Sequence, residues 1–185
     1  MSPLLERVSN SAFGFLGSTG PAGAFESIAS AAGTGSSGTI TFNSIPSTYQ
    51  HLQVRLFSIA ASGGYAMRFN SDTANNYARH NFGGNGSSVF ASGTATTNMM
   101  FVGDDSATSY GSVMIIDIHD YASTSKYKTI RSFFGHDRNG TGSVYLYSGL
   151  WMSTSAVNSL SLGVGNFGGT FSTSTVAALY GIKGA

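Results

Sequence analysis

Cysteine is absent from this chain of 185 residues, and charged residues are scarce. Without cysteine the chain can form no disulfide, no thiolate metal site and no thiol nucleophile. Only 9% of the residues are charged, well below the roughly 25% that is usual in soluble domains. Serine, threonine, asparagine and 25 glycines must therefore keep the surface hydrated. These residues favour turns and strand surfaces over helices, because short polar side chains compete for backbone hydrogen bonds and glycine widens the choice of φ.

Long hydrophobic runs and a charge excess are missing as well. No stretch of about 18 apolar residues exists, so the sequence predicts no membrane-spanning helix, and the opening MSPLLERVSNSAFGFLG lacks the pattern of a secretion signal. The net charge is +1 and the nine basic residues are scattered, which argues against binding to a nucleic-acid backbone. A polar surface without disulfides or a signal suggests assembly in a reducing cytoplasm and service outside the cell, although many cytoplasmic proteins lack cysteine too.

The first 24 residues have a different pattern from the rest. They contain two short apolar clusters separated by polar residues, and a run of glycine, serine and threonine ends them at Pro21. We expect residues 1–24 to form an arm and residues 25–185 to form the folded domain, although a frayed terminus is the alternative. The apolar residues of the arm are expected to contact a capsid or a neighbouring subunit, and they are Leu4, Leu5, Phe13, Phe15 and Leu16.

Alternation of apolar and polar residues with period two recurs from Phe25 onward, between turn signals. This pattern is typical of half-buried strands. It predicts roughly ten short strands, at residues 39–42, 51–59, 65–70, 88–91, 99–102, 112–119, 128–134, 143–151, 160–164 and 176–182. No segment shows a helical stripe, and parallel strands would need helical crossovers. The predicted fold class is therefore all-β, an antiparallel two-sheet β-sandwich of jelly-roll type.

Residues 113–118 are apolar on both strand faces. A strand of this kind needs two covers, one from the facing sheet and one from a neighbouring chain or loop. The predicted core consists of Leu52, Val54, Leu56, Val113, Ile115, Ile116, Ile118, Leu160 and Leu162.

Catalytic and cofactor motifs have weak support. Residues 163–168 match the spacing of a dinucleotide-binding fingerprint, but a helix former and a later acidic residue are both missing, so we interpret them as a glycine-rich turn. The four histidines lie far apart, and the nearest approach to a cluster is Asp117, His119, Asp120, His136 and Asp137. Asn85-Gly86 and Asn139-Gly140 are interpreted as turns. The sequence thus predicts neither an enzyme nor a metal or other cofactor.

Aromatic residues with nearby asparagine and aspartate suggest two uses. They could stack on carbohydrate, or they could lie in the core or in a subunit interface. Tyr145 and Tyr147 are two positions apart and share one strand face, which favours the second use. The candidate residues are Tyr121, Tyr127, Tyr145, Tyr147 and Trp151.

Five segments between Phe25 and the end of the chain have a distinctive wording, and they are ITFNSIPSTYQHLQVRL, RFNSDTANNYARHNFGGNGSS, IIDIHDYASTSKYKTIRSF, SGLWMSTSAVNSLSL and ALYGIKG. These segments resemble tailed-phage virion proteins, including those of cyanophages. The resemblance runs from about Phe25 to Ala185 and implies a β-sandwich similar to trimeric capsid cement proteins and to the distal domains of tail spikes. It carries no set of functional residues.

The expected function is that of a capsid cement or decoration protein. Such a homotrimer binds the major capsid protein on the outer surface of the virion and stabilises the shell by adding buried area. The alternative is a receptor-binding domain of a tail spike or fibre that contacts host-surface carbohydrate. An enzyme, such as a polysaccharide hydrolase, is the third and least supported hypothesis, because a glycosidase needs two placed carboxylates and the carboxylates here are few.

Overall fold

The computed structural model describes residues 24–60, 63–104 and 110–184 of the chain. Within them it contains two antiparallel sheets and no helix, so none of these residues form a helix that could cross a membrane. The strands are β1 (Phe25–Ala32), β2 (Thr39–Phe42), β3 (His51–Ser58), β4 (Tyr65–Phe69), β5 (Tyr77–Gly84), β6 (Val89–Thr97), β7 (Met100–Gly103), β8 (Ser112–His119), β9 (Lys128–Asp137), β10 (Gly142–Trp151), β11 (Leu160–Val164) and β12 (Val176–Ile182). The prediction of an all-β antiparallel sandwich is confirmed.

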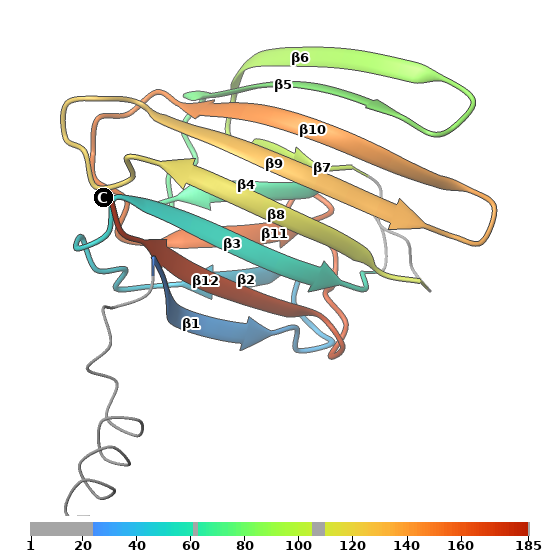
Figure 1. The fold of residues 1–185 in the computed structure, drawn as a ribbon, viewed down its shortest axis with the longest axis horizontal. Coiled ribbons are helices and arrows are strands. Elements are labelled where there is room, and N and C mark those ends of the chain that lie inside the picture. The colour runs from blue at the N-terminus through green and yellow to red at the C-terminus, as the bar shows by residue number, and fades with distance from the viewer. Residues whose placement is uncertain (1–23, 61–62, 105–109, 185) are drawn as a thin grey trace, which may run out of the picture.

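The two sheets differ in width. The large sheet has eight strands in the order β1-β12-β3-β8-β9-β10-β5-β6, and the small sheet has four in the order β2-β11-β4-β7. Four pairings are nested along the chain, because β1 pairs with β12, β2 with β11, β3 with β8 and β4 with β7. The remaining strands, β9, β10, β5 and β6, extend one side of the large sheet (Figure 1).

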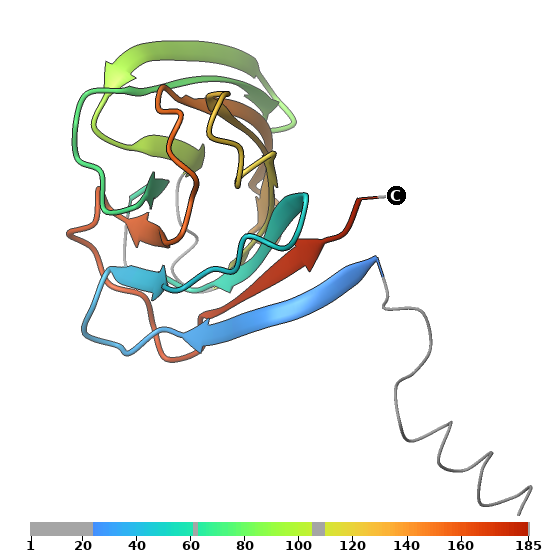
Figure 2. The ribbon, with the colours of Figure 1, turned by 90° about the vertical axis from the view of Figure 1, so that its left-hand side faces the viewer.

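The large sheet is strongly curved. Figure 2 shows it passing from β1 and β12 at the bottom to β5 and β6 at the top, so that its inner side partly encloses the small sheet. Curvature of this kind follows from the twist of β-strands, which accumulates across a wide sheet. The β7 strand packs against β9 and β10 and is the edge of the small sheet that lies nearest to the curved extension.

The core lies between the two sheets, and alternate residues of each strand supply it. In β3 the inward side chains are those of Leu52, Val54 and Leu56, all of which are buried. Ile116 and Ile118 of β8 are also buried, as are Leu160 and Leu162 of the small sheet. These seven residues confirm most of the predicted core.

Val113 and Ile115 correct that prediction. They are 60% and 41% exposed, because they lie on the outer face of β8 while Met114 and Ile116 point inward. The period of two in a strand allows only one of the two sets to reach the core. An apolar pattern on both faces cannot reveal which set is buried.

The strand predictions were accurate where an apolar alternation is clear. The predicted segments 112–119, 160–164 and 176–182 have the bounds of β8, β11 and β12. The sequence pattern did not indicate β5, whose residues YARHNFGG contain few apolar side chains. A strand of this composition is held by its pairing with β10 and β6 on both sides.

Turn chemistry agrees with the sequence interpretation. Asn139 and Gly140 both have positive φ in the hairpin between β9 and β10, and Gly86 has positive φ in the hairpin between β5 and β6. Residues 163–168 comprise the end of β11 and the tight turn that follows it, in which the amide of Gly168 donates to the carbonyl of Gly165 at 3.0 Å. No helix follows this turn in the described part of the chain, whereas the dinucleotide-binding fingerprint needs a helix at that place. The segment is therefore a glycine-rich turn.

Candidate functional site

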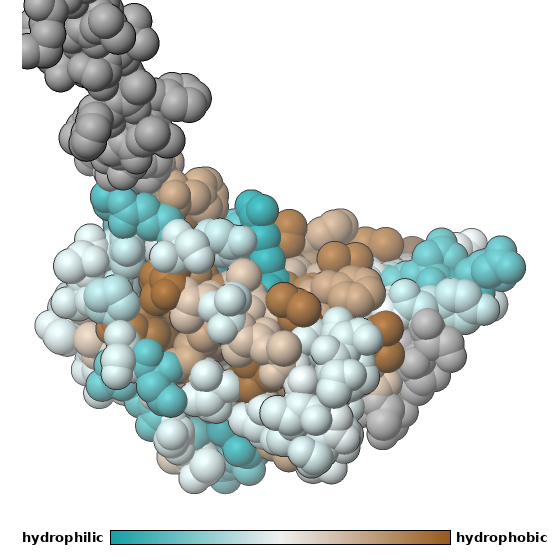
Figure 3. All heavy atoms as spheres, turned by 90° about the horizontal axis from the view of Figure 1, so that it is seen from below, coloured by the Kyte–Doolittle hydropathy of each residue, from teal (hydrophilic) through white to brown (hydrophobic). Residues whose placement is uncertain are grey.

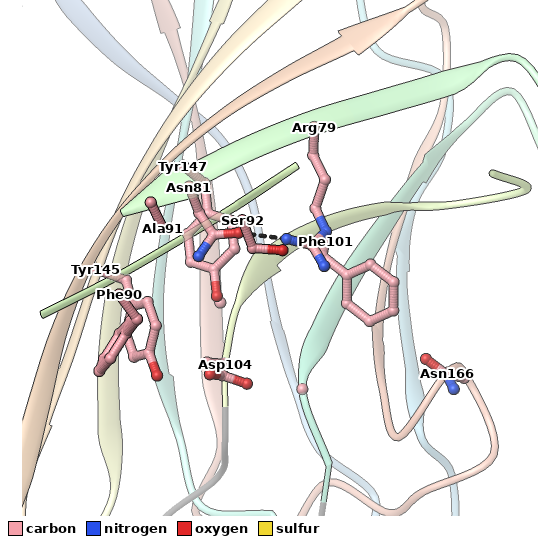
Figure 4. A pocket seen from close by; sticks show the side chains of 12 residues that line it. Arg79, Asn81, Phe90, Ala91, Ser92, Phe101, Asp104, Tyr145, Tyr147 and Asn166 are labelled. Atoms are coloured by element: carbon pink, nitrogen blue, oxygen red, sulfur yellow. Dashed lines mark hydrogen bonds between the residues drawn. The ribbon is translucent and has the colours of Figure 1, made fainter. Parts of the chain in front are cut away.

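The inner face of the curved extension is the first candidate site. Because the large sheet has eight strands and the small sheet has four, the small sheet cannot cover the whole inner face of β10, β5 and β6. A cleft of about 470 Å³ lies there, between these strands and β7. Figure 4 shows its lining side chains. They are Arg79, Asn81, Phe90, Ala91, Ser92, Phe101, Asp104, Tyr145, Tyr147 and Asn166, together with Gly64 and Gly103.

Arg79 supplies the positive charge of the cleft from β5. One guanidinium nitrogen, Nη1, donates to the side-chain oxygen of Asn81, two positions along the same strand. The guanidinium carbon lies 5.1 Å from the centre of the Phe101 ring, an arrangement that a cation favours because the face of the ring is electronegative. The Nε atom of Arg79 is buried and has no hydrogen-bond partner among the described residues.

Tyr147 lies deeper in the same cleft. It is only 3% exposed, and its hydroxyl makes no hydrogen bond within the described part of the chain. Burial raises the pKa of this hydroxyl above its ordinary value of 10.0, and the negative charge of Asp104 raises it further. Tyr147 therefore stays protonated at neutral pH and can donate a hydrogen bond into the cleft.

The aromatic rings along β10 are held in place by one another. The Tyr145 ring lies 5.8 Å from Tyr147 and 4.8 Å from Phe90 on β6, measured between ring centres. Phe90 and Phe101 are each half-buried. In Figure 4 these two rings stand at opposite sides of the cleft, with Asp104 between them. The cleft thus combines rigid apolar surfaces with a small set of polar groups.

The turn after β11 forms the far side of the cleft. Gly165, Asn166 and Phe167 have φ values of 56°, 56° and 69° in succession. Left-handed backbone costs free energy at residues other than glycine, so the turn needs support from its surroundings. The Phe167 ring provides that support, because it packs against the backbone of Gly163 and under the Arg68 guanidinium at 4.2 Å. Asn166 is thereby fixed at the exposed rim of the cleft.

The outer face of the large sheet is the second candidate site. Strand register places its exposed apolar residues in two adjacent rows that cross the strands. We call these rows the apolar outer face. The first row contains Val176, Phe57, Val113, Val144 and Val89, and the second contains Ile115, Phe133, Leu146 and Phe82. Their exposed fractions range from 37% for Leu146 to 92% for Val89.

A polar row runs beside the apolar outer face. It contains Gln53, Asp117, Arg131, Ser148 and His80, which are paired in register from β3 to β5. The side-chain amide of Gln53 donates to Asp117 at 2.8 Å, and Arg131 donates to the Ser148 hydroxyl at 2.7 Å. Between the polar row and the residues Phe82 and Leu146 the surface is hollowed by about 560 Å³. Figure 3 shows the molecule from below the view of Figure 1, and apolar residues also reach the surface on that side.

The aromatic residues expected from the sequence are divided by the structure. Tyr145 and Tyr147 line the cleft. Tyr121 and Trp151 are buried in the core, where the Tyr121 hydroxyl donates to the carbonyl of Pro46, so neither ring presents a face to solvent. Tyr127 is 53% exposed in the loop before β9 and does not line the cleft. The arm residues Leu4, Leu5, Phe13, Phe15 and Leu16 lie outside the described residues.

The histidine and aspartate candidates do not converge. Asp117 and His119 share the outer face of β8, as their spacing predicts, but Asp117 is bonded to Gln53. The His119 ring contacts His51 at 5.1 Å, and Asp120 accepts from Lys126 at 3.0 Å. His136 and Asp137 lie at the opposite end of the β8–β9 pair. Among the described residues no group of three or more histidine, aspartate or glutamate side chains could hold a metal ion.

Sequence reasoning did not select Arg79, Asn81, Asp104 or Asn166. These four residues come from three separate places in the chain, because Arg79 and Asn81 lie within β5, Asp104 follows β7 and Asn166 follows β11. No local spacing links them. A scan against protein-family models and searches of curated proteins and of solved structures found no match to this chain.

Proposed function

We propose that this protein is a non-enzymatic structural component of a virus particle, a decoration protein that binds the outer capsid surface as a homotrimer and stabilises the shell. The sequence phrases that resemble phage virion proteins suggest the context. The apolar outer face is the observation that carries the proposal, because a contiguous exposed apolar surface is typical of a site that binds another protein. A partner that binds only the folded, assembled form stabilises that form by mass action.

The extent of the apolar outer face supports an interface. Its nine large apolar residues are between 37% and 92% exposed and together expose on the order of 800 Å², which is about the area that each partner contributes to a stable interface. Isolated exposed apolar residues are normal on a protein surface, whereas contiguous patches of this size mark interaction sites. The polar row beside it gives the patch a hydrogen-bonding border, as in other protein interfaces.

A second copy of this chain is the occupant that we propose for the apolar outer face. The net charge of +1 leaves little repulsion between copies. Three copies around a closed axis can cover one another without leaving an unpaired apolar surface, and a trimer matches the three-fold symmetry positions of a capsid. The nested pairing of β1 to β4 with β12, β11, β8 and β7 further supports a jelly-roll topology, in which two Greek keys are wrapped together.

The arm at residues 1–24 is proposed to fasten the trimer to the major capsid protein. This role is suggested by its apolar residues alone. Each of them could contribute about 1.5 to 3 kcal/mol when buried, before the cost of ordering the chain.

The second candidate function is host-surface recognition by a tail spike or fibre domain. The cleft under β5 and β6 favours it, since a concave site with aromatic and polar residues is typical of ligand binding. Copy number on the particle separates the two functions. Hundreds of copies spread over the shell would support decoration, and a few copies at the tail would support receptor binding.

Light scattering on the full chain tests the trimer. We expect the mass of three chains for the natural protein and a smaller mass for Phe133→Asp, because Phe133 lies in the middle of the second apolar row. Tyr127→Asp is the matched control, since Tyr127 is equally exposed but lies outside both rows. A natural protein that is a monomer in solution and on the particle contradicts the trimer.

Attachment is tested with undecorated capsids. Deletion of residues 1–20 should leave a trimer in solution but weaken its binding to the capsids in a co-sedimentation assay. Undiminished binding of the shortened chain would show that the arm has no fastening role.

A further inference from the structure

The cleft between β7 and the strands β10, β5 and β6 carries an inference that does not depend on the decoration function. Its volume of about 470 Å³ lies within the range of about 300 to 1,000 Å³ that is usual for small-molecule sites. Both half-buried aromatic rings and polar side chains reach into it (Figure 4).

Two hydrogen-bond donors in the cleft have no partner in the described part of the chain. The Nε atom of Arg79 is buried and makes no hydrogen bond there, and the hydroxyl of Tyr147, a residue that is 3% exposed, also lacks a hydrogen bond to a described residue. Buried polar groups in native proteins are nearly always satisfied, so an orphaned donor points to a solvent molecule or a ligand that completes it. A ligand for this cleft therefore carries hydrogen-bond acceptors.

The ligand must also carry donors, because the cleft contains acceptors of its own. Asp104 presents a carboxylate at the end of β7, and the carboxylate can accept from two neighbouring hydroxyl groups. Asn166 at the rim can both donate and accept. Hydroxyl groups are the ligand groups that serve donors and acceptors equally.

The charges in the cleft exclude a strongly ionic ligand. Arg79 and Asp104 both line it, so their charges offset one another. The Asp104 carboxylate would repel a phosphate or carboxylate, and the Arg79 guanidinium would repel a cation, since like charges at short range are unfavourable in a partly buried site. A neutral ligand meets neither penalty.

The rings of Phe90 and Phe101 in the cleft favour a sugar among neutral ligands. A sugar ring has one apolar face formed by its C–H groups, and this face packs well on an aromatic side chain while the hydroxyl groups at its edge make hydrogen bonds. The rings of Phe90 and Tyr145 are held 4.8 Å apart, so the aromatic surface is present before a ligand binds and costs little entropy to order.

We propose that the cleft lined by Arg79, Asp104 and Tyr147 binds a neutral saccharide of one or two rings. Tyr147 and Arg79 donate to sugar oxygens, and Asp104 accepts from sugar hydroxyls. The ring of Phe90 or Phe101 packs on the apolar face of the sugar.

Isothermal titration of the full chain with neutral sugars tests the proposal. The probes are glucose, galactose, mannose, N-acetylglucosamine and their disaccharides, compared with glucuronic acid and glucose 6-phosphate. Ligand is added to about 10 mM, tenfold above a Kd of about 1 mM. We expect saturable binding of at least one neutral sugar and weaker binding of its acidic counterpart.

Two conservative variants locate the site. Tyr147→Phe removes a hydroxyl that bonds to no described residue, so it should leave the fold unchanged and weaken binding about fivefold, the effect of one neutral hydrogen bond. Asp104→Asn should weaken it by tenfold or more, because hydrogen bonds to a charged group are stronger. Tyr180→Phe is the matched control, since it removes a tyrosine hydroxyl from β12, outside the cleft, and it should bind as tightly as the natural chain.

Three results would overturn the proposal. The first is the absence of binding by every neutral probe. The second is binding that Tyr147→Phe and Asp104→Asn leave unchanged, which would place the sugar elsewhere on the protein. The third is preferential binding of the acidic probes that Asp104→Asn strengthens, which would make the cleft an anion site. None of these results bears on the oligomeric state, so the decoration function stands or fails separately.

Discussion

The indole N–H of Trp151 donates a hydrogen bond to the carboxylate of Asp72, with 2.7 Å between Nε1 and Oδ2. This bond joins the end of β10 to the loop after β4, and the Trp151 ring lies against Phe69 and Tyr77. Asp72 also accepts from the backbone amide of Ala74 and from the side chain of Asn76. A single carboxylate thus organises the loop and positions the only tryptophan of the chain, which explains why this ring serves the core.

Asp72→Ala is expected to lower the free energy of unfolding by about 2 to 3 kcal/mol, because it leaves the buried indole N–H without a partner and removes two further hydrogen bonds. Chemical denaturation at pH 7 measures the change. Asp137→Ala provides the control, since Asp137 is exposed and its carboxylate accepts a hydrogen bond from the amide of Asn139 in a hairpin loop. A loss for Asp72→Ala no larger than that of the control would contradict the role given to Asp72.

The stabilisation from Glu26 should depend on pH. Hydrogen bonds from Lys183 and Tyr49 lower the pKa of the Glu26 carboxyl below its usual 4.5. Since the pKa is lower in the folded state, the contribution of Glu26 is present above pH 4.5 and is lost as the pH falls through the folded value. Lys183→Met should therefore move the pKa of Glu26 up toward 4.5, as followed by NMR titration of the carboxyl carbon. A pKa that does not change would mean that the pair does not form in solution.

Ile116 and Ile115 are neighbours in β8 with opposite environments, since Ile116 is fully buried and Ile115 is 41% exposed. We expect Ile116→Asp to abolish soluble folding, because an unpaired buried charge costs more than the 5 to 15 kcal/mol by which a domain is typically stable. Ile115→Asp should fold and should weaken self-association. Circular dichroism and light scattering on both variants provide the comparison. Equal effects of the two substitutions would mean that the inward and outward faces of β8 are wrongly assigned.

Gly149 in β10 allows β7 to approach the large sheet. A Cβ atom at this position would lie 2.0 Å from the Met100 sulfur and 2.9 Å from Ile130. Gly149→Ala is therefore expected to destabilise the protein by about 1 to 3 kcal/mol through overpacking. At Gly135 of β9 the nearest atoms would be at 3.7 and 3.9 Å, so Gly135→Ala should be neutral or stabilising by up to about 1 kcal/mol. Thermal unfolding of the two variants tests the contrast, and a harmless Gly149→Ala would argue against the close approach of β7.

The sequence alone was sufficient for the fold class and for many of the strand positions. Alternation of apolar and polar residues depends on local geometry, since successive side chains of a strand point to opposite faces. Asparagine-glycine pairs likewise specify turns through their own backbone preferences. The β11 turn and the strands β8, β11 and β12 were therefore predictable from short segments.

The tertiary structure decided the rest, because it depends on which strands become neighbours. Only the sheet order shows that the outward residues of β8 lie beside those of β9 and β10, and so form one apolar outer face. The cleft likewise exists because an eight-stranded sheet curves past a four-stranded one. It brings Arg79, Asp104 and Asn166 together from distant segments. Such contacts depend on which distant strands pair with one another, and local patterns in the sequence do not show this pairing.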